Sequence, residues 1–187
     1  MAIDSELFLS SITSVLGPVK FRANLNDYEH VTDSGVLAQL IDDNKLTLEP
    51  STIDSVRTLF VGGLIEHIQT VGPFPAIHGA TQIIDRLRQS TEYCVAIATG
   101  GWRKSALLKL ESSGFNVEGI PIVSCDESPS RTEIMRIALA RLGSDLESAT
   151  YFGDAAWDRR ACQTLGWDFV PVGTDLGGIE SYEDFDF

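Results

Sequence analysis

The sequence has few cysteines, and none is placed for a disulfide framework or a zinc site. Cys94, Cys125 and Cys162 lie far apart, no Cys-x-x-Cys or Cys/His spacing connects them, and their number is odd. The simplest interpretation is three buried free thiols in a reducing cytoplasm. The sequence also lacks a long apolar run and the basic and apolar regions of a signal peptide. Neither secretion nor a membrane-spanning segment is therefore predicted.

Positive charge is scarce as well. Fourteen Lys and Arg face 27 Asp and Glu, which gives a formal net charge of −13. Nucleic acids and anionic membranes both require a basic face, so neither is an expected partner. The motifs of a nucleotide P-loop, a dinucleotide fold and a hydrolase nucleophile elbow are absent too. With 43% hydrophobic and 22% charged residues, the 187 residues suit one globular domain, or one domain with an inserted subdomain.

The second half of the chain alternates between strand and helix patterns. Short apolar runs predict buried strands at 93–99, 120–124, 150–152 and 169–172. Between them, helical patterns extend from Trp102 to Gly114, from Ser130 to Gly143 and from Asp154 to Gly166. Ser130 and Glu133 form a capping-box pattern at the start of the second of these helices. The alternation predicts an α/β fold, a doubly wound (Rossmann-like) parallel sheet with its active site outside the carboxyl ends of the strands.

The first half reads as helical. Helices are predicted at 4–16, 53–68 and 79–88, and no convincing buried strand lies between residues 17 and 72. We therefore expect residues 17–72 to be a helical insertion, with residues 1–16 and 73–187 forming the Rossmann-like core. The acidic end, residues 180–187, is predicted to be a solvated tail.

The most informative stretch is Ala149–Asp158, where an apolar strand enters a Gly-Asp turn and a helix with a second Asp four residues later. Residues at i and i+4 share one helix face, and two like charges there disfavour the helix unless a cation lies between them. A metal-binding role for Asp154 and Asp158 would explain that pattern. The alternative is structural: Asp154 caps the helix, and Asp158 pairs with Arg159 or Arg160.

Together these residues resemble the haloacid dehalogenase superfamily, and especially its capped, phosphoglycolate-phosphatase-like members. Members of this superfamily are mostly magnesium-dependent phosphatases. The resemblance implies that Thr99, at the end of a strand, holds the substrate phosphate. A hydroxyl group and the amides of Gly100 and Gly101 at a helix N-terminus would form an anion cradle. The alternative for Thr99 is that it only caps the following helix.

The resemblance extends to two charged positions. Arg131 stands where the family places a Lys or Arg that neutralises the phosphate, although Arg differs from Lys in geometry. The alternative is an exposed first-turn residue. Gly153-Asp154 and Asp158 match the Gly-Asp-x-x-x-Asp motif for Mg²⁺, and carboxylates suit a hard cation. The implied catalytic residues are thus Thr99, Arg131 and Asp154, with Mg²⁺ as cofactor and a small phosphorylated metabolite as substrate in the cytoplasm.

The helical insertion is similar to the mobile cap of this family. Within it, residues His30–Gly35 resemble a segment seen in some capped members, and one interpretation is that they face substrate. The alternative is that Thr32, Asp33 and Ser34 serve as N-cap residues for the helix that follows.

The sequence departs from the family in one respect: it lacks the Asp-x-Asp-Gly-Thr motif. In the family this motif ends the first strand and supplies the nucleophilic Asp and the acid/base Asp. Here the residues from Ile3 to Glu6 resemble the segment that relatives carry just after the motif. We therefore expect a truncated start, a missing central strand between those of Thr99 and Asp154, and unpaired sheet edges there. Two hypotheses result: a phosphatase-like hydrolase truncated before its nucleophile, or a non-catalytic phosphate-binding or regulatory relative.

Overall fold

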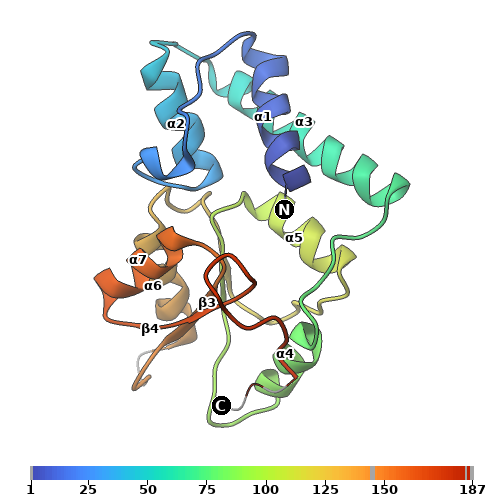
Figure 1. Cartoon of the computed structure of the whole chain (residues 1–187), viewed down its shortest axis with the longest axis vertical. Helices are drawn as coiled ribbons and strands as arrows, with labels where there is room; N and C mark the ends of the chain where they lie inside the picture. The colour runs from blue at the N-terminus through green and yellow to red at the C-terminus, as the bar shows by residue number, and fades with distance from the viewer. Residues whose placement is uncertain (1, 144–145, 184, 186–187) are drawn as a thin grey trace.

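The structure is a computed structural model that describes residues 2–143, 146–183 and 185. Helices make up the first half, and strands alternate with helices in the second, so the predicted mixed α/β class is confirmed (Figure 1). The elements in chain order are α1 (Ala2–Leu16), the 3-10 helix η1 (Leu25–Asp27), α2 (Asp33–Asp43), α3 (Pro50–Thr70), α4 (Ala80–Arg88), β1 (Ile97–Ala98), α5 (Arg103–Ser112), β2 (Ile122–Val123), α6 (Arg131–Leu142), β3 (Thr150–Gly153), α7 (Ala156–Leu165) and β4 (Asp168–Pro171).

The four strands form two parallel pairs instead of one continuous sheet. β1 pairs with β2, where Ile97 lies opposite Ile122, and β3 pairs with β4, where Thr150 lies opposite Asp168. The first two strands are shorter than the apolar runs predicted. Within the described residues, β1 and β3 each have a ladder partner on one side, and a strand with one partner has fewer hydrogen bonds to hold it extended.

One side chain joins the two strand pairs. The hydroxyl group of Tyr151 on β3 donates a hydrogen bond to the carbonyl oxygen of Ala98 on β1, at 2.9 Å. Burial raises the pKa of Tyr151, so the phenol stays protonated and keeps its donor. The Tyr151 hydroxyl group thus binds a backbone carbonyl that would otherwise accept from the amide of a neighbouring strand.

The main core lies between the helices of the first half and the first strand pair. Phe8 of α1, Phe60 of α3 and Trp102 before α5 form an aromatic cluster, with ring centroids 5.6 to 6.0 Å apart in edge-on arrangements. Ile12 and Val123 are fully buried in the same core. A smaller core joins α6 to α7 and contains Met135, Ala161 and Cys162.

The described part of the acidic end is packed, which corrects the prediction of a solvated tail. Tyr182 and Phe185 contact Phe152 of β3, with ring centroids 5.7 and 5.1 Å away. The amide of Tyr182 also donates to the carbonyl of His78 at 2.8 Å, so this end lies beside the start of α4 (Figure 1). Residues 184, 186 and 187 of the predicted tail lie outside the described residues. Aromatic burial outweighs the acidic character of the segment.

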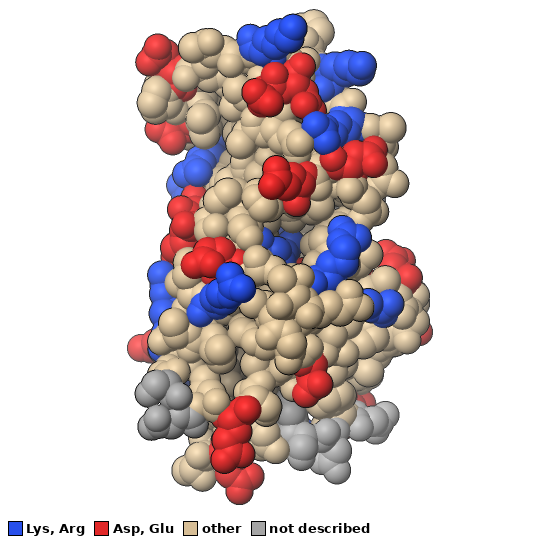
Figure 2. Space-filling view, turned by 90° about the vertical axis from the view of Figure 1, so that its left-hand side faces the viewer, with Lys and Arg blue, Asp and Glu red and all other residues tan. Residues whose placement is uncertain are grey.

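Two further expectations concern the surface. Cys125 and Cys162 are buried as predicted, but Cys94 is exposed because its predicted strand is not formed at that position. On the face shown in Figure 2, Lys and Arg side chains lie among Asp and Glu. None of the described helices is both long enough and apolar enough to cross a membrane.

The Tyr151 bridge gives a direct test of the fold. Replacing Tyr151 by Phe removes the donor to the Ala98 carbonyl and leaves the ring in place. We expect the free energy of unfolding to fall by about 1–2 kcal/mol, because a partly buried acceptor loses its partner. Urea denaturation measures the change, with an unaltered slope expected. Equal stability of the two proteins would show that the bridge contributes nothing.

Candidate functional site

The turn after β1 contains the three residues predicted to form an anion cradle, Thr99, Gly100 and Gly101. The Thr99 hydroxyl oxygen accepts a hydrogen bond from the Gly101 amide at 3.1 Å, and the Thr99 amide donates to the carbonyl of Val123 at 2.8 Å. The N-cap of α5 is Trp102, so the alternative that Thr99 caps this helix is wrong. Thr99 instead lies in the turn before the helix. Its hydroxyl oxygen accepts from the Gly101 amide, which the sequence predicted to bind an anion.

Arg131 converges on this turn. It is the first residue of α6, and its side chain, 16% exposed, lies against Gly100 so closely that a Cβ there would collide with the guanidinium group. The alternative of an exposed first-turn residue is therefore wrong. The helix begins after Ser130 as predicted, but the Ser130 side chain makes no cap hydrogen bond, because its hydroxyl group contacts that of Thr132 instead.

A buried ion pair anchors Arg131. Its Nε lies 3.3 Å from Oδ1 of Asp158, whose side chain is 5% exposed, and neither atom has a hydrogen-bond partner in the described part of the chain. The partner of Asp158 is thus Arg131, not Arg159 or Arg160. Gly153 makes this approach possible, since a Cβ at that position would lie 2.8 Å from the Cβ of Asp158.

Asp154 does not share a helix face with Asp158, which corrects the i, i+4 argument. Helix α7 begins at Ala156 with Ala155 as N-cap, so Asp154 lies in the turn before the helix and is exposed. It is not the N-cap either. The two carboxylates still interact: burial raises the pKa of Asp158, Arg131 opposes that rise, and the charge of Asp154 adds to it.

The two carboxylates expected to bind Mg²⁺ have different surroundings, one exposed and one buried. The described residues contain no cluster of three or more His, Cys, Asp or Glu side chains that could hold a metal ion. A site on two carboxylates would need both to face one ion, whereas Asp158 is buried against a guanidinium group that already neutralises it. Magnesium binding at Asp154 and Asp158 stays a prediction.

The segment before α2 reaches into the same place. Thr32 is the N-cap of α2, and its hydroxyl oxygen accepts from the Gly35 amide at 3.0 Å, which confirms the capping alternative for this residue. Asp33 instead binds the turn before α5. Its Oδ2 accepts a hydrogen bond from the Trp102 amide at 2.9 Å, and its own amide donates to the Gly100 carbonyl at 2.8 Å.

The Asp33 carboxyl group has an unusual environment. Burial raises the pKa of Asp33 to about 6 against the opposing effect of its hydrogen bond from Trp102. The charge of Asp4 adds to the rise, and Lys109 and Arg131 counteract it. A carboxylate is therefore held beside the turn predicted to bind phosphate, at a cost that the positive charges only partly offset.

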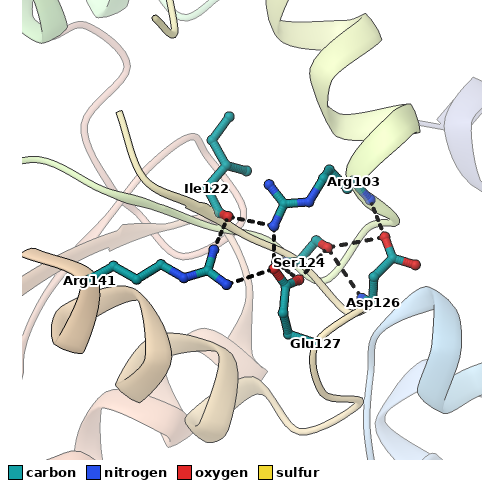
Figure 3. Close-up of polar contacts among 6 residues, drawn as sticks. All are labelled: Arg103, Ile122, Ser124, Asp126, Glu127 and Arg141. Atoms are coloured by element: carbon teal, nitrogen blue, oxygen red, sulfur yellow. Dashed lines mark hydrogen bonds and ion pairs between the residues drawn. The ribbon is translucent and has the colours of Figure 1, made fainter. Parts of the chain in front are cut away.

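A second polar network fixes the loop after β2 (Figure 3). The Glu127 carboxylate accepts hydrogen bonds from the Ser124 amide at 3.0 Å, from the Ser124 hydroxyl at 2.9 Å and from Arg141 at 3.0 Å, and it also pairs with Arg103. Both arginines donate to the carbonyl of Ile122 as well. Burial acts to raise the pKa of Glu127, but these hydrogen bonds together lower it to about 2. The network ties α5 and α6 to the end of β2 below the site.

Sequence reasoning missed three of these residues. The pattern around Asp33 indicated a substrate-facing segment or a cap residue, and neither interpretation included a contact with the Trp102 amide. For Tyr151 the sequence offered one signal, a hydroxyl-bearing side chain in an apolar strand that ends at Gly153. Glu127 had one local signal, Ser124 three residues earlier, but its arginine partners come from two helices.

Known proteins share both the sequence pattern and the fold. The family model described as "Haloacid dehalogenase-like hydrolase" matches residues 15–172. A hydrolase from Pseudomonas syringae has a similar structure, with a TM-score of 0.67 and 17% sequence identity over 94% of this chain and 81% of the other. Protein tyrosine kinase A from Mycobacterium tuberculosis is also similar, with a TM-score of 0.51 and 18% identity over 98% and 82% of the chains. These structures show the fold. No curated protein matches the sequence significantly.

The raised pKa of Asp33 predicts how stability depends on pH. Because the folded protein binds this proton more tightly than the unfolded chain, the contribution of Asp33 to stability is lost as pH rises from about 4 through about 6. Asp33→Asn should remove this part of the pH dependence and raise the free energy of unfolding at pH 7 by about 1–3 kcal/mol. Chemical denaturation at several pH values measures it. A variant less stable than wild type at pH 7 would contradict the expectation.

Glu127 should act in the opposite direction. Its lowered pKa means that its stabilisation is present above about pH 4.5 and is lost as pH falls towards about 2. We expect Glu127→Gln to lower the free energy of unfolding at pH 7 by about 2–3 kcal/mol, with little difference near pH 2. The matched control is Glu133→Gln on α6, whose surface pair with Arg136 should contribute less than about 0.5 kcal/mol. Equal effects of both substitutions would argue against the network.

Proposed function

The chain belongs to the haloacid dehalogenase-like hydrolase family, and from this premise we propose that its site binds the phosphate group of a small phosphorylated metabolite, as in a phosphatase. The proposed ligand residues are Thr99, Gly100, Gly101 and Arg131. Residues 17–72, with α2 and α3, are proposed to act as the cap, and the cytoplasm is the proposed location.

The observation that carries this proposal is the position of Arg131 against the Thr99–Gly101 turn. A guanidinium group matches the geometry of phosphate oxygens and can donate two parallel hydrogen bonds to them. The turn leads into α5, whose positive dipole end favours an anion, and the Trp102 and Arg103 amides there already donate to the carboxylates of Asp33 and Asp126. Arg131 and Gly100 are 31 positions apart in the sequence, yet a Cβ at Gly100 would occupy the place of the guanidinium group. The two features therefore support one anion site.

The residues of this chain would bind and orient the phosphate and neutralise its charge. Fixed donors of this kind stabilise the charge on a transferring phosphoryl group, often the largest catalytic effect. The nucleophile of the family has no counterpart motif in the 187 residues. We therefore propose that these residues bind phosphate without turnover on their own. We propose Mg²⁺ as the cofactor because the family implies it, and Asp154 as its ligand because this carboxylate is exposed.

A second candidate is a non-catalytic phosphate-binding or regulatory relative. The buried pair between Arg131 and Asp158 favours it, because a carboxylate neutralised by an internal cation is poorly suited to bind a catalytic metal. Both candidates share the anion site, and they differ in whether a phosphomonoester is hydrolysed.

Phosphate binding tests the shared part of the proposal. Inorganic phosphate is titrated into the 187-residue protein and its variants by calorimetry. Arg131→Gln should weaken binding by more than about tenfold, because a charged donor is lost. Thr99→Val should weaken binding by about three- to tenfold, the effect of one neutral hydrogen bond, and it leaves the Arg131–Asp158 pair intact in case the Arg131 variant fails to fold.

The matched control is Arg136→Gln, an exposed arginine on the same helix, which should leave binding unchanged. Phosphate binding that neither Thr99→Val nor Arg131→Gln weakens would overturn the proposal, as would the absence of binding to the wild type. Hydrolysis of p-nitrophenyl phosphate, with and without Mg²⁺, is then compared between the 187 residues and the same chain with the Asp-x-Asp-Gly-Thr motif added before Ile3. Turnover only with the motif supports the hydrolase, and no turnover in either protein supports the non-catalytic relative.

A further inference from the structure

The anion cradle contains a carboxylate from this chain itself. Oδ2 of Asp33 accepts the Trp102 amide, which is the N-cap amide of α5. It lies 3.6 Å from the place of a Cβ on Gly101, so the carboxylate is beside the turn as well. Asp33 therefore occupies the amide that directly follows the predicted cradle residues Thr99 to Gly101, beside the turn where a phosphate oxygen would bind.

Several contacts fix the segment that carries this carboxylate. The Thr32 hydroxyl donates to the carbonyl of Pro129 at 2.9 Å, and the indole nitrogen of Trp102 donates to the Ser34 hydroxyl at 3.0 Å. Arg131 Nη2 donates to the carbonyl of Val31 at 3.1 Å. The segment from Val31 to Ser34 thus engages both the turn and the cation of the proposed phosphate site.

The charges around Asp33 come from three helices. Lys109 of α5 and Arg131 of α6 attract its carboxylate, whereas Asp4 of α1 repels it, and Asp4 is itself paired with Lys109 at 2.9 Å. A desolvated carboxylate beside another acid is an unfavourable occupant of the cradle, held mainly by the amide and the two cations. A phosphate dianion would use the same amide and Arg131 with more charge and more acceptor oxygens.

We propose that Asp33 is an internal competitor for the phosphate site: its carboxylate closes the anion cradle, and a phosphate ligand binds only when this side chain withdraws. The inference rests on the proposed function, because it concerns the regulation of that same site. Displacing Asp33 costs free energy. The apparent affinity of the wild type for phosphate is therefore lower than that of a site from which the Asp33 carboxylate has withdrawn.

The test is a titration with inorganic phosphate of wild type, Asp33→Asn and Asp33→Ser, followed by calorimetry and by the amide NMR signal of Trp102. Both variants remove the charge, and serine also shortens the side chain. We expect each to bind phosphate at least about tenfold more tightly than wild type, with the Trp102 amide signal shifting during the titration. The matched control is Asp42→Asn, which removes the same charge from an exposed position on α2 and should bind like wild type.

The outcomes separate the two proposals. If wild type binds phosphate and both Asp33 variants bind no more tightly, the competitor role is overturned and the phosphate site stands. A gain of equal size in Asp42→Asn would also overturn it, because the effect would then be general charge. If none of the proteins binds phosphate, the proposed function fails and the competitor role fails with it. Two Asp33 variants are used so that the test remains valid if one of them misfolds.

Discussion

The buried ion pair between Arg131 and Asp158 is the constraint on which the site depends. Withdrawing two charges from water is costly, and the pair is tolerated only because each side chain approaches the other closely. That approach requires space on both sides. Gly100 leaves room for the guanidinium group and Gly153 leaves room for the carboxylate, since a Cβ at either position would collide with the pair. The pair therefore accounts for a glycine after β1 and another at the end of β3.

Trp102 is the second point at which distant parts of the chain meet. Its ring packs on Phe8 and Phe60, and the guanidinium carbon of Arg57 lies 5.0 Å from the ring centroid. Arg57 also pairs with Asp126 at 3.1 Å, so α3 is connected to the loop after β2. Because the amide of the same residue binds Asp33, the packing of the helices of the first half and the state of the anion cradle are coupled through one residue.

Much of the fold could be predicted because it depends on local patterns. Apolar periodicity and glycine endings located the helices, and the order of strands and helices indicated the Rossmann-like class. The long-range partners could not be predicted in this way. Asp158 pairs with a residue 27 positions earlier, which i, i+4 reasoning does not consider. Asp154 lies outside α7 because the helix begins two residues later. Tyr182 packs on Phe152 although its neighbours in sequence are acidic.

The separation of the strands into two pairs changes what holds the two parts of the α/β region together. The first pair belongs to the large core with α1, α3 and α5, and the second flanks the small core between α6 and α7. Backbone ladders normally transmit cooperativity across a sheet, and here no ladder among the described residues crosses from β1 to β3. Side chains connect the two pairs across this gap: Tyr151 binds the Ala98 carbonyl, Arg131 pairs with Asp158, and α6 places Ile134 in the large core and Met135 in the small one. The cohesion of the two pairs therefore depends on the packing of α6 and on a few polar side chains.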